Sequence, residues 1–400
     1  MDTKIYTKMD KRKLLTIASF VSVFLVVTGL SYLFFSNSSI GGSLRSPMTP
    51  ATKIVGDKIT FDPTLPKTEN CPLNGTLYSK QQKDWWEKHA PLGVMIENHQ
   101  DARPQSGLSS ADVIYEAVAE GGITRFLAIF YCQDAGIVGP VRSARTYFLD
   151  FISEYGNYPL YAHVGGANQA GPADALSQID SYGWSAYNDM NQFSIGFPTF
   201  WRDYDRLGHP AQTEHTMYST TDKLLQLAST RGITNVDKDG KKWDSNFVPY
   251  SFKDDAAQAV RPASQTIHVE PWTQYAQYAQ YAVDWTFDRT TNLYNRNNGG
   301  APHIDRNTNT QLTSKNIVLL SMVETHAFDG YENNQHLLYR DKGIGKAQIF
   351  IDGVATTGTW RKDTRTARTL LFDSLGAPIK FDRGTIWFEI LPTDAVVSVK

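Results

Sequence analysis

The chain begins with a basic segment followed by one long apolar run. Leu14–Phe35 is an uncharged stretch of 22 residues, enough for one helix across the roughly 30 Å of hydrocarbon in a bilayer. Residues 1–13 carry five Lys and Arg against two Asp. The positive-inside rule therefore places residues 1–13 in the cytoplasm and residues 36–400 outside, behind one transmembrane helix. A cleaved signal peptide is the alternative, although the run exceeds the usual apolar core of about 7–15 residues and no small-x-small cleavage site follows it.

Beyond the apolar run, residues 36–70 are rich in Ser, Thr, Pro and Gly, which is typical of a flexible stalk. Short strand patterns and helical patterns then alternate. Strands are predicted over Leu92–Glu97, Val113–Glu120, Ile123–Cys132 and Leu160–Val164, and helices over Gln81–His89, Arg142–Tyr155, Pro172–Ile179 and Thr221–Ser229. Gly121-Gly122 favours a hairpin between the second and third strands. Residues 71–262 are therefore predicted to form an α/β or α+β domain.

The helical pattern ends near residue 262. Four strand patterns follow, over Asn316–Val323, Ala347–Ile351, Val354–Arg361 and Thr385–Leu391. Asp352-Gly353 separates two of them and is a favoured hairpin turn. Residues 263–400 are therefore predicted to form a small all-β C-terminal domain.

Charge and cysteine content exclude several classes of protein. Lys and Arg number 39 and Asp and Glu 41, a net charge of -2; residues 1–13 hold +3 of this, which leaves -5 for residues 14–400. A mildly acidic exported part argues against a dedicated nucleic-acid binder. The two cysteines exclude a disulfide-rich scaffold and a four-cysteine zinc site. Both lie in the exported part, where oxidation is allowed, so we predict a disulfide between Cys71 and Cys132; a plain buried strand residue is the alternative for Cys132.

An ordered run of motifs makes this chain similar to a known family. The motifs are Arg103–Leu108 (RPQSGL), Ala111-Asp112, Tyr115-Glu116, Glu120–Arg125 (EGGITR) and Gly139–Arg145 (GPVRSAR), with looser matches at Tyr294–Arg296, Gly353 and Trp360. They resemble the YerB-like family, a domain of unknown function with a separate C-terminal domain. The resemblance implies an exported bacterial protein, typically a lipoprotein, in some members linked to the cell-wall synthesis machinery. This chain departs from that pattern, because no cysteine near the end of its apolar run is available for a lipid.

The strongest chemical signal within these motifs is a group of arginines. If Arg142–Tyr155 is helical, Arg142 and Arg145 share a face in its first turn, where free backbone N–H groups also attract anions. Two guanidinium groups there can bind a carboxylate or phosphate, and Arg125 is a further candidate for the same ligand site. The alternative is an internal ion pair with Glu116 or Glu120.

Carboxylates and a histidine suggest a second possible chemistry. Glu116 and Glu120 invite comparison with a glycosidase pair, but on one strand they would lie about 13 Å apart, too far for such a pair. Only one of them can act, with a partner such as Asp112 or Asp174. His163 ends a predicted strand just before Gly165-Gly166 and Asn168, at the edge where ligands of open α/β sheets bind. A buried histidine bonded to the backbone is the alternative.

No cofactor or metal is predicted. His209 and His215, with Glu214 between them, do not form an H-E-x-x-H motif, and the sequence indicates no third ligand. Asn235–Gly240 imitates the start of a calcium loop, but Asn246 stands where such a loop needs a bidentate Glu, so a simple turn is predicted.

Two functions follow from these patterns. The first is a membrane-anchored binding or scaffold protein of the bacterial cell envelope, single-pass in the plasma membrane, that binds an anionic envelope polymer or a cell-wall protein partner. The alternative is a hydrolase or lyase of peptidoglycan or another envelope glycan that uses Glu116 or Glu120 together with His163. The sequence does not decide whether the protein is an enzyme.

Overall fold

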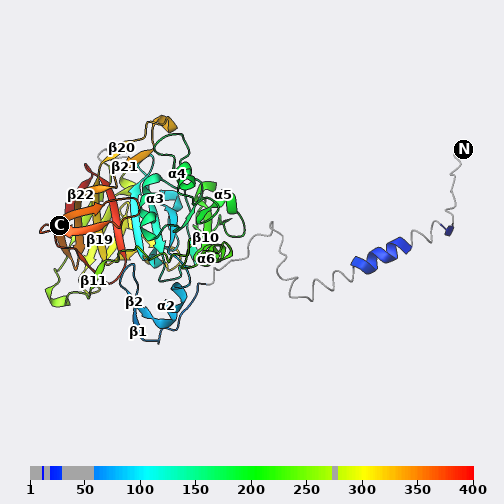
Figure 1. Ribbon diagram of the computed structural model, residues 1–400, viewed down its shortest axis with the longest axis horizontal. Coiled ribbons are helices and arrows are strands. Elements are labelled where there is room, and N and C mark those ends of the chain that lie inside the picture. Colours follow the sequence, from blue (N-terminus) through cyan, green and yellow to red (C-terminus); the bar gives the residue numbers. More distant parts are fainter. Residues whose placement is uncertain (1–10, 13–18, 29–57, 273–277) are drawn as a thin grey trace. The chain divides into compact units, whose positions relative to one another are not determined.

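A ten-stranded mixed sheet runs through both halves of the chain (Figure 1). Its strands, in spatial order, are β24 (Leu370–Asp373), β23 (Val354–Lys362), β22 (Gly343–Ile351), β19 (Asn316–Met322), β26 (Ile386–Pro392), β4 (Val113–Val118), β5 (Thr124–Phe130), β3 (Leu92–Glu97), β7 (Leu160–His163) and β8 (Asp189–Asn191). The two halves of the chain meet where β26 pairs in parallel with β4. Each of these two strands is buried along its whole length, as expected of apolar runs at the centre of a sheet.

The computed structural model describes residues 11–12, 19–28, 58–272 and 278–400. The chain divides into an N-terminal unit, Met1–Val55, and a second unit, Gly56–Lys400. In the first unit, residues 19–28 are helical. Across the described ranges, no helix is both long enough and apolar enough to cross a membrane. Only part of the predicted anchor, Leu14–Phe35, falls within those ranges.

The second unit holds both predicted domains in one body. Residues 71–262 are mixed α/β and residues 263–400 are rich in strands, as the sequence predicts. The segments do not separate at residue 262, however, because five strands of each lie side by side in the ten-stranded sheet, with β26 of one segment paired to β4 of the other. Periodicity finds such strands but carries no information about which strands pair.

A second sheet of six strands belongs entirely to the C-terminal segment. It consists of β15 (Ala301–Pro302), β14 (Leu293–Asn298), β13 (Val283–Asp288), β12 (Thr266–Glu270) and β27 (Val396–Val399), with β18 (Thr313–Ser314) paired to β14. Trp285 of β13 packs edge-on against Trp387 of β26, with ring centroids 5.1 Å apart. Alternate residues of β13 are buried, which is the pattern of a strand with one face on a core.

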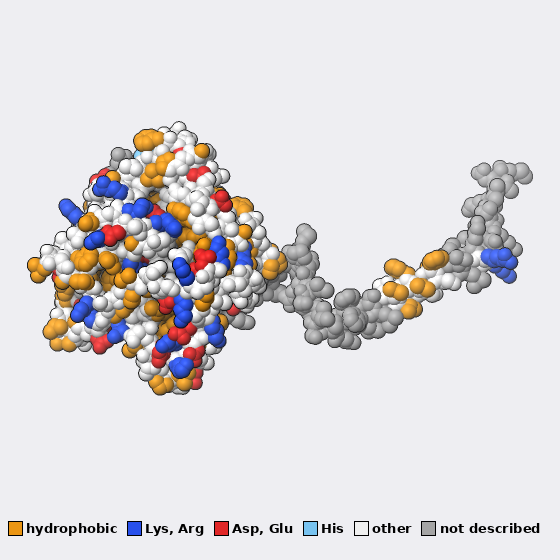
Figure 2. Space-filling model, in the orientation of Figure 1, with side chains coloured by type: hydrophobic (Ala, Val, Ile, Leu, Met, Phe, Trp, Pro, Cys, Tyr) orange, Lys and Arg blue, Asp and Glu red, His pale blue; other side chains and the backbone are white. Residues whose placement is uncertain are grey.

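Short strands and helices complete the unit. The small sheets are β1 (Lys67–Asn70) with β2 (Leu77–Ser79); β6 (Ile137–Val138), β10 (Met217–Thr220) and β9 (Trp201–Arg202); β11 (Ser251–Lys253) with β25 (Lys380–Asp382); β16 (Ile304–Asp305) with β17 (Thr310–Gln311); and β20 (Glu324–His326) with β21 (Leu337–Tyr339). The helices are α2 (Lys80–Trp86), α3 (Thr146–Ile152), α4 (Ala175–Ser181), α5 (Gln192–Ile195) and α6 (Thr221–Thr230). Acidic and basic side chains are interspersed over the face drawn in Figure 2. On that face no broad patch of one charge indicates a nucleic-acid surface.

The predicted hairpin at Gly121-Gly122 is present between β4 and β5. Both glycines have positive φ, 59° and 79°, as a two-residue turn of the favoured type requires. A Cβ atom on Gly122 would lie 2.5 Å from the ring of Tyr278, so the close approach of that ring also requires glycine.

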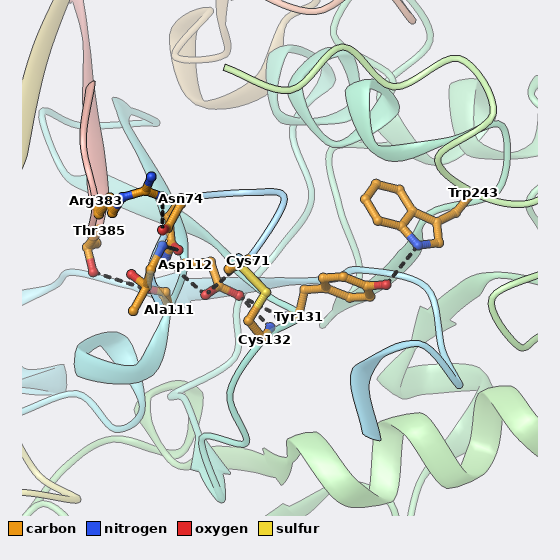
Figure 3. The surroundings of a disulfide bond; sticks show 11 residues. Cys71, Asn74, Ala111, Asp112, Tyr131, Cys132, Trp243, Arg383 and Thr385 are labelled. Atoms are coloured by element: carbon orange, nitrogen blue, oxygen red, sulfur yellow. Dashed lines mark hydrogen bonds between the residues drawn. A yellow bond between two sulfur atoms is a disulfide. The ribbon is translucent and has the colours of Figure 1, made fainter. Parts of the chain in front are cut away.

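The predicted disulfide joins Cys71 to Cys132 (Figure 3). It connects the segment before β2 to the residues after β5. Beside it, the buried carboxylate of Asp112 accepts the backbone N–H groups of Tyr131 and Cys132, both at 2.8 Å. Burial raises the pKa of Asp112 to about 7.

The predicted stalk is too long at its C-terminal end. Within residues 36–70, Lys67–Asn70 forms β1, and Ile59 donates its backbone N–H to Asp134. Phe61 packs its ring against Trp85, with centroids 5.6 Å apart. The polar composition of this stretch hides the ordered part, because β1 is a short strand of exposed and half-exposed residues without apolar alternation.

Candidate functional site

Two of the sequence-predicted polar residues, Glu120 and His163, lie with Glu97 at one edge of the ten-stranded sheet. Both β3 and β4 are antiparallel to β5, and β7 is parallel to β3, so these three strands end at the same edge. Glu97 is the last residue of β3, Glu120 lies two residues beyond β4, and His163 is the last residue of β7. This is the edge at which open α/β sheets bind their ligands.

The predicted helix over Arg142–Tyr155 begins four residues later than expected. Helix α3 starts at Thr146, and Arg145 precedes it in an extended conformation. The reason lies in the sheet: the backbone N–H of Arg142 bonds to the carbonyl of Met95, and that of Ala144 bonds to the carbonyl of Gly165, both at 2.9 Å. The two arginines therefore do not share a helical face, and the anion site predicted from that spacing is wrong in its geometry.

Arg142 and Arg145 each pair with a carboxylate, but the alternative prediction of Glu116 or Glu120 as the partner holds only for Arg145. Arg142 Nε lies 3.1 Å from Glu97 Oε1. Arg145 Nε donates to Glu120 Oε1, and Arg125 Nη2 lies 3.0 Å from Glu120 Oε2. Burial acts to raise the pKa of Glu120, but the charges of Arg125 and Arg145 outweigh it and lower that pKa to about 2. We call Arg125, Arg142, Arg145, Glu97 and Glu120 the arginine cluster.

Arg125 is the member of this cluster whose hydrogen-bonding capacity is least used. It is 8% exposed, and its Nε and Nη1 have no hydrogen-bond partner among the described residues. Burial lowers the pKa of Arg125 below its ordinary value, and the positive charge of Arg145 lowers it further. An unpaired buried donor costs about 1–3 kcal/mol, so these two N–H groups favour binding of an acceptor from outside the cluster.

Two other buried arginines also have unpaired N–H groups, but aromatic rings face them. The guanidinium carbon of Arg296 lies 4.8 Å from the ring centroid of Trp387, and that of Arg368 lies 4.2 Å from Tyr250. Each ring offers a negative π-face to the cation. Within the described part of the chain, no such ring contact is found for Arg125.

A second polar group adjoins the arginine cluster at Glu97. His215 Nδ1 lies 2.9 Å from Glu97 Oε2, and the His215 ring stacks on that of His99 with centroids 4.7 Å apart. Glu97 was not a sequence candidate. The one available signal was a charged residue that closes the otherwise apolar strand Leu92–Glu97.

His163 lies at the predicted position, but both of its ring nitrogens are bonded to groups of the protein. Its side chain is completely buried, with Nδ1 2.7 Å from the carbonyl oxygen of Gly165 and Nε2 2.6 Å from Asp189 Oδ1. Asn168 is exposed in the loop after β7. His163 is therefore the buried, satisfied histidine of the alternative prediction.

Glu116 is also fully bonded, away from solvent. Its Oε1 accepts from Thr124 Oγ1 at 2.8 Å, and its Oε2 accepts from Arg296 Nη2 at 2.6 Å and Trp387 Nε1 at 3.1 Å. Glu120 is held by two arginines and His163 by Asp189. The three catalytic candidates thus have no carboxylate or ring nitrogen that is both exposed and unpaired.

Comparison with known proteins agrees with this two-part organisation. Residues 76–234 match the N-terminal domain, and residues 273–388 the C-terminal domain, of a family described as "Protein of unknown function (DUF3048)". A protein of Bacillus subtilis (strain 168) named "Putative lipoprotein YerB" is 29% identical over 339 residues, which cover 84% of this chain and 90% of that protein. The crystal structure of YerB protein from Bacillus subtilis covers 83% of this chain and 100% of its own, with a TM-score of 0.65 and 26% identity. The chain belongs to the YerB-like, two-domain family of proteins of unknown function.

Proposed function

We propose that this protein is a membrane-associated, extracytoplasmic binding protein of the cell envelope that holds an anionic group at the arginine cluster. The observation that carries the proposal is Arg125, a buried guanidinium for which the described residues provide no partner to two of its N–H groups and no facing aromatic ring. A carboxylate or phosphate oxygen is the acceptor that such donors bind most strongly.

The charge balance of the cluster supports an anion rather than a cation. Three arginines face two carboxylates, and Glu120 is shared between two of the arginines. The Arg142 side chain is 25% exposed and Glu120 13%, so the cluster borders solvent, although the unpaired Nε and Nη1 of Arg125 are themselves buried. An incoming anion would neutralise the excess charge in a mostly buried setting, where screening by water is weak.

The extracytoplasmic address is supported by the relative's name and by the disulfide. The relative is named a lipoprotein, and disulfides persist in oxidising compartments outside the cytoplasm. Lipid attachment to cysteine requires a free thiol, yet both cysteines of this chain are joined to each other. We therefore assign membrane attachment to the apolar run Leu14–Phe35, with residues 1–13 cytoplasmic and the binding unit outside.

The proposed partner is a cell-envelope polymer or cell-wall protein that presents carboxylates. Peptidoglycan fragments with free carboxyl groups are suitable probes, since the same fragments can be prepared with neutral amides. The alternative, a glycan hydrolase using Glu116 or Glu120 with His163, gains no support from the geometry, because each of these side chains is engaged by protein partners.

The test is calorimetric titration of the full chain in detergent micelles with a carboxylated muropeptide and its amidated counterpart. Wild-type protein should bind the carboxylated form, more weakly at high salt, and should bind the amidated form at least tenfold less tightly. Arg125→Met should abolish the preference. The control Arg361→Ala removes an arginine from an exposed pair with Asp363 and should leave binding unchanged. Equal binding of the two muropeptides by wild-type protein would refute the proposal.

A further inference from the structure

Three potential metal ligands converge beside the arginine cluster. Ligand atoms of His99, Asp101 and His215 all lie within 4.8 Å of one another. His99 lies two residues beyond the end of β3, Asp101 lies in the 3-10 helix Gln100–Ala102, and His215 ends the 3-10 helix Thr213–His215. More than a hundred residues separate His215 from the other two, so the fold, and not local sequence, brings them together.

His215 is already held in the orientation that a metal ligand needs. Its Nδ1 lies 2.9 Å from Glu97 Oε2, and since a carboxylate accepts the proton of Nδ1, the neutral ring has its lone pair on Nε2. Among the described residues, no hydrogen bond to His215 Nε2 is found. Glu97 is itself oriented by Arg142 at 3.1 Å. A carboxylate behind a ligating histidine is the arrangement that fixes the ring and raises its basicity in metal sites.

The other two side chains lie nearer to solvent. The His99 side chain is 25% exposed and that of Asp101 50%, whereas that of His215 is only 6% exposed. The His99 and His215 rings are stacked, with an angle of 9° between their planes. Metal–ligand bonds of about 2.0–2.2 Å require the three ligand atoms to approach one another more closely than 4.8 Å. Rotation of the partly exposed His99 and Asp101 side chains provides that movement while His215 stays fixed.

We propose that His99, Asp101 and His215 form a binding site for a divalent first-row transition metal ion of the zinc type. Two imidazoles and one carboxylate are a donor set that such ions take, with a coordination position left open. Glu97 acts as a positioning residue through His215. The sequence analysis predicted no metal because it identified no third ligand for His209 and His215, whereas the fold brings His99 and Asp101 from the loop after β3 beside His215. The metal site shares Glu97 with the arginine cluster, but the proposal does not rest on ligand binding at Arg125.

The test is Zn²⁺ binding by the untagged full chain in detergent micelles, measured by competition with a chromogenic chelator. One Zn²⁺ per chain should bind, and Co²⁺ should give the visible absorption of a low-symmetry site with nitrogen ligands. His99→Ala should reduce Zn²⁺ affinity at least 100-fold, and His215→Ala likewise. Glu97→Gln should keep one Zn²⁺ per chain but weaken its binding about 10–100-fold.

A matched control is His209→Ala, since that exposed histidine lies near the site with its ring nitrogens on the carbonyls of Pro210 and Arg103. Its loss should leave Zn²⁺ affinity unchanged. Should His215→Ala fail to fold, His99→Ala decides, because its side chain is partly exposed. Absence of Zn²⁺ and Co²⁺ binding at 100 µM metal, or affinity that His99→Ala and Asp101→Ala leave intact, would overturn the proposal.

Discussion

Two arginine–carboxylate sites at the ten-stranded sheet differ in what surrounds the guanidinium. In the interior, Arg296 pairs with Glu116 at 2.6 Å, and the rings of Trp387, Trp285 and Phe126 lie within 5.6 Å of its guanidinium carbon. At the sheet edge, Glu120 is divided between Arg125 and Arg145, and Arg125 keeps two unpaired N–H groups. Both pairs involve residues of the family motifs.

The difference shows that the role of an arginine in a family motif depends on the groups that surround its guanidinium. Arg296 comes from the C-terminal segment and Glu116 from the N-terminal one, so this pair joins the two parts of the fold. The carboxylate of Glu116 and the surrounding aromatic rings interact with most of the Arg296 guanidinium. Arg125 shares its carboxylate with Arg145, and in the described part of the chain no ring faces it, so it retains donors for a ligand. The first site stabilises the fold, and the second is proposed to bind.

The largest expected effect is on Arg296. Arg296→Ala leaves Glu116 buried without its cation and should lower the free energy of unfolding by about 3–5 kcal/mol. Urea unfolding of the full chain in micelles, followed by tryptophan fluorescence, measures it. The matched control Arg361→Ala breaks only the exposed pair with Asp363 and should change stability by less than about 1 kcal/mol. Similar losses for both variants would show that the interior pair is not structural.

The two sites should also differ in their response to pH. The pKa of Glu120 is lowered to about 2 in the folded protein, so its stabilising contribution is present above pH 4.5 and is lost as the pH falls toward 2. In wild-type protein, the free energy of unfolding should fall by about 3 kcal/mol on this account as the pH drops from 4.5 to 2. Glu120→Gln should not show this fall.

Glu389, which accepts a bond from Trp285, behaves in the opposite way. Burial raises its pKa well above the ordinary 4.5, and the carboxylate of Glu116 raises it further. Its contribution to stability is therefore full below pH 4.5 and is lost as the pH rises through the raised pKa. Glu389→Gln should flatten that decline. Unfolding midpoints of both variants and of wild-type protein are measured between pH 3 and pH 8. If the midpoints of all three proteins change with pH in the same way, Glu120 and Glu389 do not have the opposite effects proposed for them.

A smaller effect is expected at Arg145. Arg145→Ala should lower the free energy of unfolding by about 1–3 kcal/mol, because Glu120 keeps Arg125 as a partner. The same unfolding assay compares it with Arg296→Ala. A loss for Arg145→Ala as large as that for Arg296→Ala would show that both sites hold the fold together, and the contrast between them would fail.

Local sequence patterns predict the strands well and the site only in part. The apolar run Leu92–Glu97 is β3 as predicted, and Gly121-Gly122 marks the hairpin, because alternation and turn chemistry are local properties. The start of α3 was missed because the N–H groups of Arg142 and Ala144 bond to β3 and to the loop after β7, a long-range effect. The junction of β26 with β4 was missed for the same reason.

The candidate residues also divide into those that local sequence identifies and those whose role depends on long-range contacts. Motif spacing identified Arg125, Arg142, Arg145 and Glu120, which the structure brings together at one edge. It could not show that the side chains of Glu116 and His163 are bonded to Arg296 and Asp189, because these partners are distant in sequence. Glu97 and His99 escaped notice, since their role depends on His215, which the fold brings beside them.

The most direct test of the central claim is phosphate binding to wild-type protein and to Arg125→Met, which keeps an apolar stem of similar length but has no donors. The melting temperature of each full-length protein in micelles is measured as phosphate rises from 0 to 50 mM at constant ionic strength. The account predicts a saturable rise for wild-type protein and none for Arg125→Met. The same rise in both proteins, or no saturable rise in wild-type protein, would contradict the claim that Arg125 holds its unpaired donors for an anion.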